Sequence, residues 1–348
     1  MICPHCSADL KRKQRYGRRC STCRKTFALE PKENSLHLHD LRVRRLAGVL
    51  ADPLRPEAAP LRYTADQLRL AASRKALANP SEMSDWLRFA GVVAIVGGMI
   101  GIFGLGAGSA ETLIAALFGV VGVYILCLIG HTATAGQRAF AGEPMSAGEF
   151  ASQMRRWEEV YGEPPPGLLT SQAPAGDVWP SRPAVALLYC PDAGTSAFLV
   201  ASGIVERRGV AVINQEPALQ SAVRAHPVLP VYVLHPADPV GCMAVPRLRA
   251  VLPPGTRAID AGLRPRVAAR AGPPVRIRPD PEVLDELAHT GAVDADEQAW
   301  LAEGKTFPLA AVRPARLLMA VEGAVTQVDP EERRAAAVGF MAWPERVG

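Results

Sequence analysis

Four cysteines within the first 23 residues constrain this chain more than any other feature of its sequence. They form two C-x2-C pairs with 13 residues between the pairs: Cys3, Cys6, Cys20 and Cys23. Two thiolates separated by two residues share one tight turn, and two such turns can complete a tetrahedral four-sulfur site. The other three cysteines are scattered through the chain, which does not fit a disulfide framework. We therefore expect a metal site in a reducing compartment.

The segment 1–30 resembles the zinc-ribbon knuckles of many bacterial proteins. The resemblance implies structural Zn²⁺, because four cysteine ligands leave no open position for catalysis. The metal would hold together a segment too short to build its own core. His5 lies inside a complete four-cysteine set, so we expect it to be a bystander. A redox dithiol is the alternative.

Positive charge is concentrated between the two cysteine pairs. The chain carries a net charge of +5, and residues 11–25 hold eight Lys or Arg and no acid. Six of these basic residues and one tyrosine are the seven candidate nucleic-acid contacts: Lys11, Arg12, Lys13, Arg15, Tyr16, Arg18 and Arg19. Cations can follow a phosphate backbone while an aromatic ring stacks on a base. A protein partner, an anionic lipid surface and a solvated loop are the alternatives.

Apolar periodicity and capping residues predict helices on both sides of the centre of the chain. Segment 31–80 is expected to contain an amphipathic helix at 36–51 and a second helix from Thr64 to Ala78, opened by the T-x-x-Q capping box. A third amphipathic helix is expected in 143–162, opened by Ser146 and Glu149.

Two charge-free apolar runs, 89–110 and 112–130, predict a transmembrane helical hairpin over 86–131. The short loop between the runs puts both flanks on one side, and the flanking Arg and Lys residues favour the cytoplasm. We therefore expect a two-span protein of the cell membrane, with the lipid bilayer as a partner. The G-x-x-x-G patterns at 97–101 and 104–108 also suggest a homodimer through glycine-rich helix faces.

The rest of the chain is predicted to be a Pro/Gly linker at 163–183, an α/β domain at 184–328 and a C-terminal tail at 329–348. Apolar strand-like runs alternate with helical patterns in the α/β domain, which favours a mostly parallel sheet. The expected fold class is thus a multidomain chain: zinc ribbon with short helices, transmembrane hairpin, and C-terminal α/β domain.

Ligands of open α/β sheets bind beyond the carboxyl ends of the strands. The candidate ligand-binding residues follow two such strands: Asp192, Gly194, Thr195, Ser196, His235, Asp238 and Gly241. The second group has the outline D-x-D-x-x-G, with Pro236 at the first Asp position, and resembles the Toprim domain of topoisomerases, primases and related nucleases. That resemblance implies a Toprim-like or Rossmann-like fold and, where enough acids converge, Mg²⁺.

As a whole, the chain resembles uncharacterised zinc-ribbon membrane proteins of actinobacteria. The likeness rests on CPHC…CSTC, the segment LHDLRVRRLA and the two apolar runs. The sequence contains no G-x-x-x-x-G-K-[ST] and no G-x-S-x-G motif, and no catalytic residue can be named. We expect a membrane-tethered cytoplasmic binding or adaptor protein that contacts nucleic acid or protein. The alternative is a metal-dependent, nuclease-like phosphoryl-transfer enzyme.

Overall fold

A four-stranded parallel sheet organises the C-terminal half of the chain. The computed structural model describes residues 1–348 except 55–58, 79–90, 92–121, 123–141, 171–176 and 327–348. The strands are β1 (Ala186–Tyr189), β2 (Val210–Ile213), β3 (Val231–Val233) and β4 (Ala258–Asp260), in the order β2-β1-β3-β4. Chain direction across the sheet therefore reverses between β1 and β3, which makes their carboxyl ends the topological switch point.

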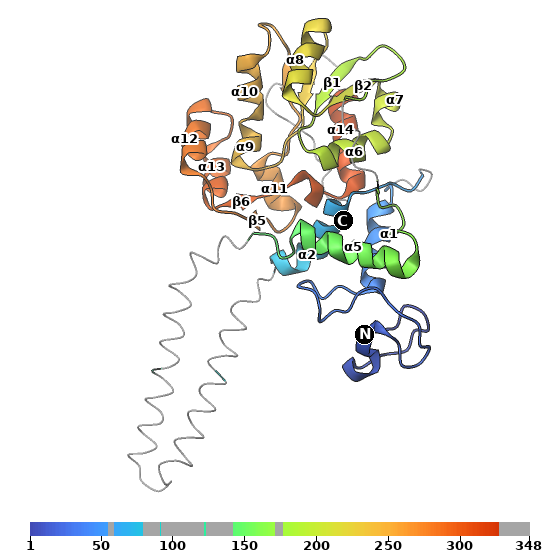
Figure 1. Ribbon diagram of the computed structural model, residues 1–348. Helices are drawn as coiled ribbons and strands as arrows, with labels where there is room; N and C mark the ends of the chain where they lie inside the picture. The colour runs from blue at the N-terminus through green and yellow to red at the C-terminus, as the bar shows by residue number, and fades with distance from the viewer. Residues whose placement is uncertain (55–58, 79–90, 92–121, 123–141, 171–176, 327–348) are drawn as a thin grey trace.

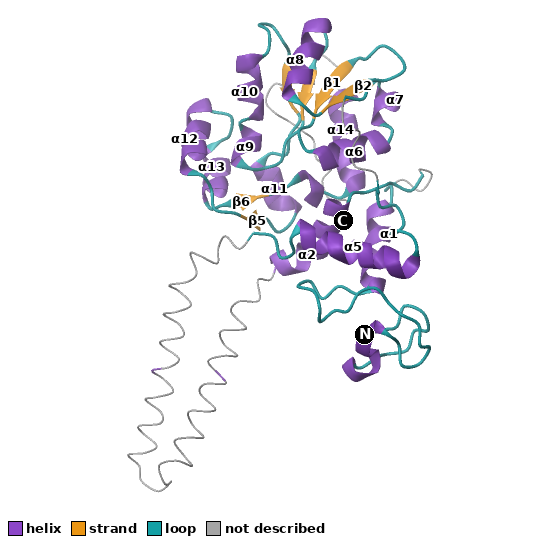
Figure 2. Ribbon diagram, viewed as in Figure 1, coloured by secondary structure: helices purple, strands orange, loops and turns teal. Residues whose placement is uncertain are grey.

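Helices cover both faces of this sheet (Figure 2). One face packs against α6 (Ala193–Ala201), α7 (Ile204–Arg208) and α14 (Pro314–Thr326), and the other packs against α8 (Glu216–Ala225) and α10 (Ala244–Val251). Successive strand residues point to opposite faces, so Leu188 joins the first core and Leu187 the second. The parallel α/β arrangement expected for this region is present.

A smaller subdomain extends one side of the sheet. It contains α9 (Pro239–Cys242), α11 (Pro265–Ala271), α12 (Pro281–Thr290) and α13 (Ala295–Ala302). β5 (Val275–Arg276) and β6 (Lys305–Thr306) form a separate antiparallel pair, followed by the 3-10 turn η2 (Leu309–Ala311). β5 and β6 therefore lie outside the parallel sheet, although both belong to the segment 184–328 that was predicted as one α/β domain.

Three helices of the N-terminal half form their own core below the sheet. They are α1 (Asp40–Ala51), α2 (Ala65–Ala78) and α5 (Ala147–Tyr161). The capping box of α2 is confirmed by reciprocal bonds between Thr64 and Gln67, and Ser146 caps α5 as expected. Figure 1 shows the cysteine-rich segment, including η1 (Arg12–Arg18), beside these helices and away from the sheet.

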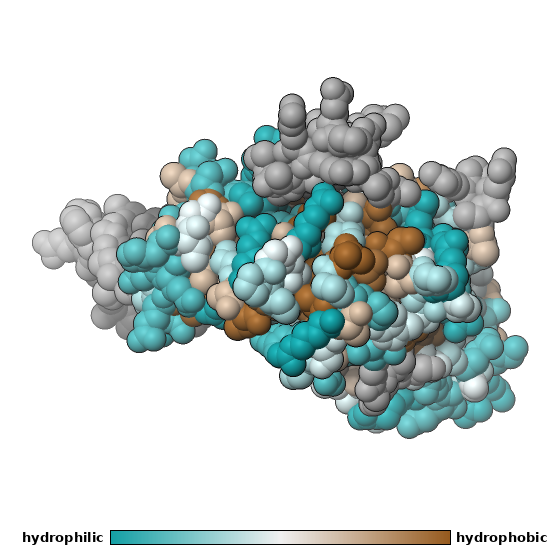
Figure 3. Space-filling view, turned by 90° about the horizontal axis from the view of Figure 1, so that it is seen from above, coloured by the Kyte–Doolittle hydropathy of each residue, from teal (hydrophilic) through white to brown (hydrophobic). Residues whose placement is uncertain are grey.

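Most large apolar side chains of the described residues lie inside these cores. The face seen in Figure 3 is largely hydrophilic, with hydrophobic residues in several small groups among the hydrophilic ones. The predicted linker 163–183 also contributes contacts: Leu168 forms a β-bridge with Tyr63, and Val178 forms one with Val212. These bridges connect the helical core to the edge of the sheet.

The expected membrane-spanning unit requires a correction. Among the residues that the structure describes, no helix is both long enough and apolar enough to cross a bilayer. Of the predicted hairpin 86–131, only Gly91 and Gly122 are described, so both apolar runs and their glycine-rich faces lie outside the described residues. The two-span hairpin in the fold class and the multi-pass membrane location are therefore withdrawn. The predicted tail 329–348 also lies outside the described residues.

Candidate metal centre and ligand cleft

The two C-x2-C segments fold into nearly identical turns. In each turn the backbone N–H of the first cysteine donates to the carbonyl oxygen of the residue five positions later: Cys3 N to Ala8 O, and Cys20 N to Lys25 O. Its carbonyl accepts from the residue that follows the second cysteine, and that residue has a left-handed backbone, with φ of 58° at Ser7 and 60° at Arg24. Both turns thus aim two sulfurs to one side.

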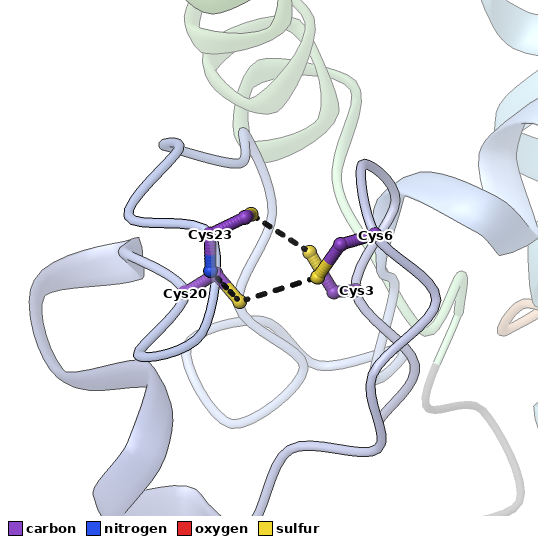
Figure 4. A group of neighbouring side chains, drawn as sticks. All are labelled: Cys3, Cys6, Cys20 and Cys23. Carbon is purple, nitrogen blue, oxygen red and sulfur yellow. Dashed lines mark hydrogen bonds between the residues drawn. The ribbon is translucent and has the colours of Figure 1, made fainter.

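The four sulfurs converge on one point (Figure 4). Their Sγ atoms all lie within 4.8 Å of one another, with 3.8 Å between Cys3 and Cys23 and between Cys6 and Cys20. A tetrahedral ion with Zn–S bonds of about 2.3 Å requires an S–S separation of about 3.8 Å. The sulfur geometry therefore fits a four-coordinate metal of the size of Zn²⁺.

Backbone N–H groups point at two of these sulfurs, and at Cys20 they favour the thiolate form. His5 N lies 3.5 Å from Cys3 Sγ, and Cys23 N lies 3.5 Å from Cys20 Sγ. The bond from Cys23 N, with a second from the backbone of Thr22, lowers the pKa of Cys20 to about 6. A metal ligand must be deprotonated, so these donors prepare the site for a cation.

His5 does not belong to the sulfur cluster. Its Nε2 donates to Thr26 O at 2.8 Å, and its ring lies 6.0 Å from the ring of Tyr161 on α5. His5 therefore joins the two cysteine turns and touches the neighbouring helix.

The ribbon is fastened to the helical core by a buried carboxylate. Asp40, at the start of α1, is fully buried and accepts from Ala28 N at 2.9 Å, from Leu29 N at 2.8 Å and from the Tyr161 hydroxyl. Arg44 lies over the Tyr161 ring, 4.9 Å from its centroid. No sequence pattern indicates this clamp, because its partners are far apart along the chain.

The seven candidate nucleic-acid contacts separate into two groups. Arg15 forms a largely buried ion pair with Glu30 at 3.1 Å, Arg18 pairs with Glu33, and Arg19 donates to Arg24 O. These three guanidinium groups stabilise the ribbon itself. The remaining residues of the set are exposed, with Tyr16 at 91%: Lys11, Arg12, Lys13 and Tyr16.

The candidate residues at the strand ends are used for capping and packing. Asp192 accepts from Thr195 N at 2.8 Å at the start of α6, and Asp238 accepts from Gly241 N at 2.6 Å at the start of α9. These bonds occupy backbone donors that a phosphate would otherwise use. Thr195 and Ser196 are buried. An added Cβ at Gly241 would stand 2.5 Å from Pro236 O, so the loop requires glycine there.

His235 is buried and held between two acceptors. Its Nδ1 lies 2.8 Å from Pro236 O, and its Nε2 lies 3.0 Å from Asp260 Oδ1. Burial lowers its pKa, but the hydrogen bond and charge of Asp260 more than compensate, so the pKa of His235 is raised overall. Since a carbonyl and a carboxylate accept, this geometry favours donation from both ring nitrogens, that is, the imidazolium form of His235. Asp260 was missed by sequence reasoning because nothing local relates it to His235.

A cleft of about 340 Å³ lies at the topological switch point, between the sheet and α2. Its charged lining residues come from both halves of the chain: Asp66, Arg69, Glu143, Asp192 and Asp238. Arg69 is buried and already paired with Asp66, at 2.9 Å, and with Glu143. The unpaired charge of the lining is therefore negative, which disfavours a nucleotide or phosphate at this edge.

The acids at this edge do not form a metal site of the kind that the Toprim resemblance implies. Within the described ranges, only the four cysteines form a group of three or more His, Cys, Asp or Glu that brings its ligand atoms together. A Mg²⁺ site needs several oxygen ligands around one point. The geometry therefore gives no support to Mg²⁺ chemistry at Asp192 and Asp238.

Comparisons with known proteins were made for the whole chain. No protein-family model, no curated protein and no solved structure matches it. The resemblances to zinc-ribbon proteins and to Toprim domains therefore stay predictions.

Proposed function

We propose that this chain is a metal-dependent binding protein whose zinc ribbon presents a basic loop to the phosphate backbone of a nucleic acid. The observation that carries the proposal is the set of exposed side chains on η1. Lys11, Arg12 and Lys13 form no ion pair with any described residue, and Tyr16 is 91% exposed beside them. Three cations and one ring on a short turn suit phosphate contact with base stacking.

The fold supports the proposal by holding this loop in place. The metal site lies at one end of the loop, and the ion pairs of Arg15 with Glu30 and Arg18 with Glu33 fix its interior. A loop that is already ordered loses less conformational entropy on binding than a free chain does. The hydrogen bonds from Ala28 N and Leu29 N to Asp40 also attach the ribbon to the helical core.

Fluorescence anisotropy of the full zinc-loaded chain on short single-stranded DNA and RNA, across a salt series, tests the proposal. The variant Lys11→Gln/Arg12→Gln/Lys13→Gln should bind weakly and should lower the slope of log K against log salt by about two. Tyr16→Ala should weaken binding by about 1–3 kcal/mol through lost stacking, with a smaller effect on the slope.

A matched control removes three exposed arginines from the α/β domain, Arg224→Gln/Arg270→Gln/Arg278→Gln. It has the same net charge as the loop variant and should keep most of the affinity. Equal loss in both triple variants would show that only net charge matters and would reject the loop as the site. No binding at low salt would reject nucleic acid as the partner.

A further inference from the structure

A second cavity, of about 620 Å³, lies against the other side of the α6–α7 turn from the sheet core. Three segments that are distant in sequence form it: the stretch before α2, the α6–α7 region and α14. Its volume is within the range typical of small-molecule sites, about 300–1,000 Å³. Nothing in the proposed function uses this cavity.

The lining residues carry an excess of positive charge. Arg62, Arg207 and Arg208 line the cavity together with a single acid, Glu322. Glu322 Oε1 lies 2.7 Å from Arg207 Nη2, and its Oε2 lies 3.1 Å from Arg208 Nη2, so one carboxylate serves two guanidinium groups. Arg62 is exposed and forms no ion pair with any described residue. Among the described lining residues, three cations and one anion give a net charge of about +2.

The lining of the cavity also includes apolar side chains. α14 contributes Leu318 and Met319, and Met319 is 38% exposed. Ala201 and Ala315 add small side chains from α6 and α14. Guanidinium groups and apolar side chains in one lining match a ligand with a charged head and an apolar body.

We propose that this cavity binds an amphipathic anion, with a carboxylate or phosphate head on Arg62, Arg207 and Arg208 and an alkyl body against Leu318 and Met319. The head offsets the excess positive charge of the described lining residues. The body covers apolar surface that water otherwise contacts. The site is independent of the nucleic-acid surface on the ribbon, so the failure of either proposal leaves the other intact.

Isothermal titration of the full zinc-loaded chain with decanoate and with decyl phosphate, both below their micelle concentrations, tests this inference. Both probes should bind at one site, and the tighter one identifies the preferred head. Inorganic phosphate, which has the head without the body, should bind at least about tenfold more weakly. Decyltrimethylammonium, with the same body and the opposite charge, should not bind.

Three variants locate the site. Arg62→Gln removes a side chain without a partner among the described residues, so the fold should be unaffected, and the affinity for decanoate should fall about tenfold. Ala201→Phe should fill the space for the alkyl body and abolish decanoate binding. The control Arg224→Gln/Arg270→Gln/Arg278→Gln should bind decanoate as the parent chain does.

Three outcomes would overturn the inference. They are no heat of binding for either decyl anion, binding of decyltrimethylammonium as tight as that of decanoate, or decanoate affinity that Arg62→Gln and Ala201→Phe both leave unchanged. The last result would place any bound anion outside this cavity.

Discussion

Gly262 lies directly against the imidazole ring of His235, so that a Cβ added to Gly262 would stand 2.1 Å from the ring. The same glycine donates its backbone N–H to Asp260 Oδ1 at 2.8 Å, and that oxygen also accepts from His235 Nε2 at 3.0 Å. The chain after β4 therefore packs closely against the ion pair and covers His235, whose side chain is 1% exposed. Arg264, 3.8 Å from Asp260 and paired with the buried Glu297, extends the network.

The close contact at Gly262 predicts that any side chain there is destabilising. Gly262→Ala should lower the free energy of unfolding by about 1–3 kcal/mol, because the methyl group must displace a ring that is fixed at both nitrogens. Chemical denaturation measures the change. Gly48→Ala is the matched control: Gly48 is exposed in α1 with nothing within 4 Å of an added Cβ. That substitution should raise the free energy of unfolding by about 0.5–1 kcal/mol. Equal effects of the two changes would contradict the packing argument.

The ion pair of His235 and Asp260 predicts a defined dependence of stability on pH. The raised pKa of His235 means that its contribution is complete below the unfolded value of about 6.5 and is lost as pH rises through the folded value. Burial raises the pKa of Asp260, but His235 and the Gly262 N–H lower it more, so the pKa is lowered overall. The contribution of Asp260 to stability is therefore lost only as pH falls below about 4. The pair should therefore stabilise the fold most between about pH 4 and pH 6.5.

Urea unfolding of the parent chain and of Asp260→Asn tests this window. The parent should be more stable by about 2 kcal/mol at pH 5.5, and the difference should shrink at pH 9 as His235 loses its proton. Asp52→Asn, which affects an exposed ion pair with Arg313, should change stability little at either pH. A difference for Asp260→Asn that is the same at both pH values would show that His235 is not charged in the folded state.

The contacts of Asp40 predict that Asp40→Ala lowers the free energy of unfolding strongly and that Tyr161→Phe lowers it only slightly. Asp40→Ala leaves the buried N–H groups of Ala28 and Leu29 without an acceptor and should lower the free energy of unfolding by about 3 kcal/mol or more. Tyr161→Phe removes one hydrogen bond and should cost about 1 kcal/mol. Thermal and chemical unfolding compare the two. If Tyr161→Phe costs as much as Asp40→Ala, the clamp depends on the hydroxyl rather than on the backbone donors.

The sulfur cluster predicts one Zn²⁺ ion per chain. Native mass spectrometry and metal analysis should find one equivalent in the parent chain and none in Cys6→Ser/Cys23→Ser. Cys190→Ala and Cys242→Ala should retain it, because both thiols are buried elsewhere and burial raises the pKa of each. Removal of the ion by a chelator should make residues 1–30 sensitive to protease, since the ribbon's own buried cluster contains few apolar side chains. Metal retained by the double serine variant would contradict the site.

Features that depend on neighbouring residues in the chain were predictable. The spacing of the four cysteines indicates the metal site because each pair closes its own turn. The capping boxes at Thr64 and at Ser146 were identifiable for the same reason, as were the buried strands that became β1 and β2. In each case the partners of an interaction lie within a few residues of one another.

Features that depend on distant residues were decided only by the tertiary structure. Arg15 and Arg18 look like free cations in the sequence, and folding pairs them with Glu30 and Glu33. Asp192 looks like a ligand for phosphate or metal, and folding makes it a helix cap. The two apolar runs also predicted a membrane hairpin, but no helix in the described part of the chain is long and apolar enough to cross a bilayer.

The sequence by itself thus determined the cysteine cluster, the helix starts and the parallel α/β character, because local spacing and short-range hydrogen bonds dictate them. Only the tertiary structure decided which charges remain available for binding. Packing brings Asp66, Arg69 and Glu143 to the switch point beside Asp192, and it gathers Arg62, Arg207 and Arg208 around a single acid. Charge balance at a site is a sum over residues that the chain brings together from far apart, and no local pattern records that sum.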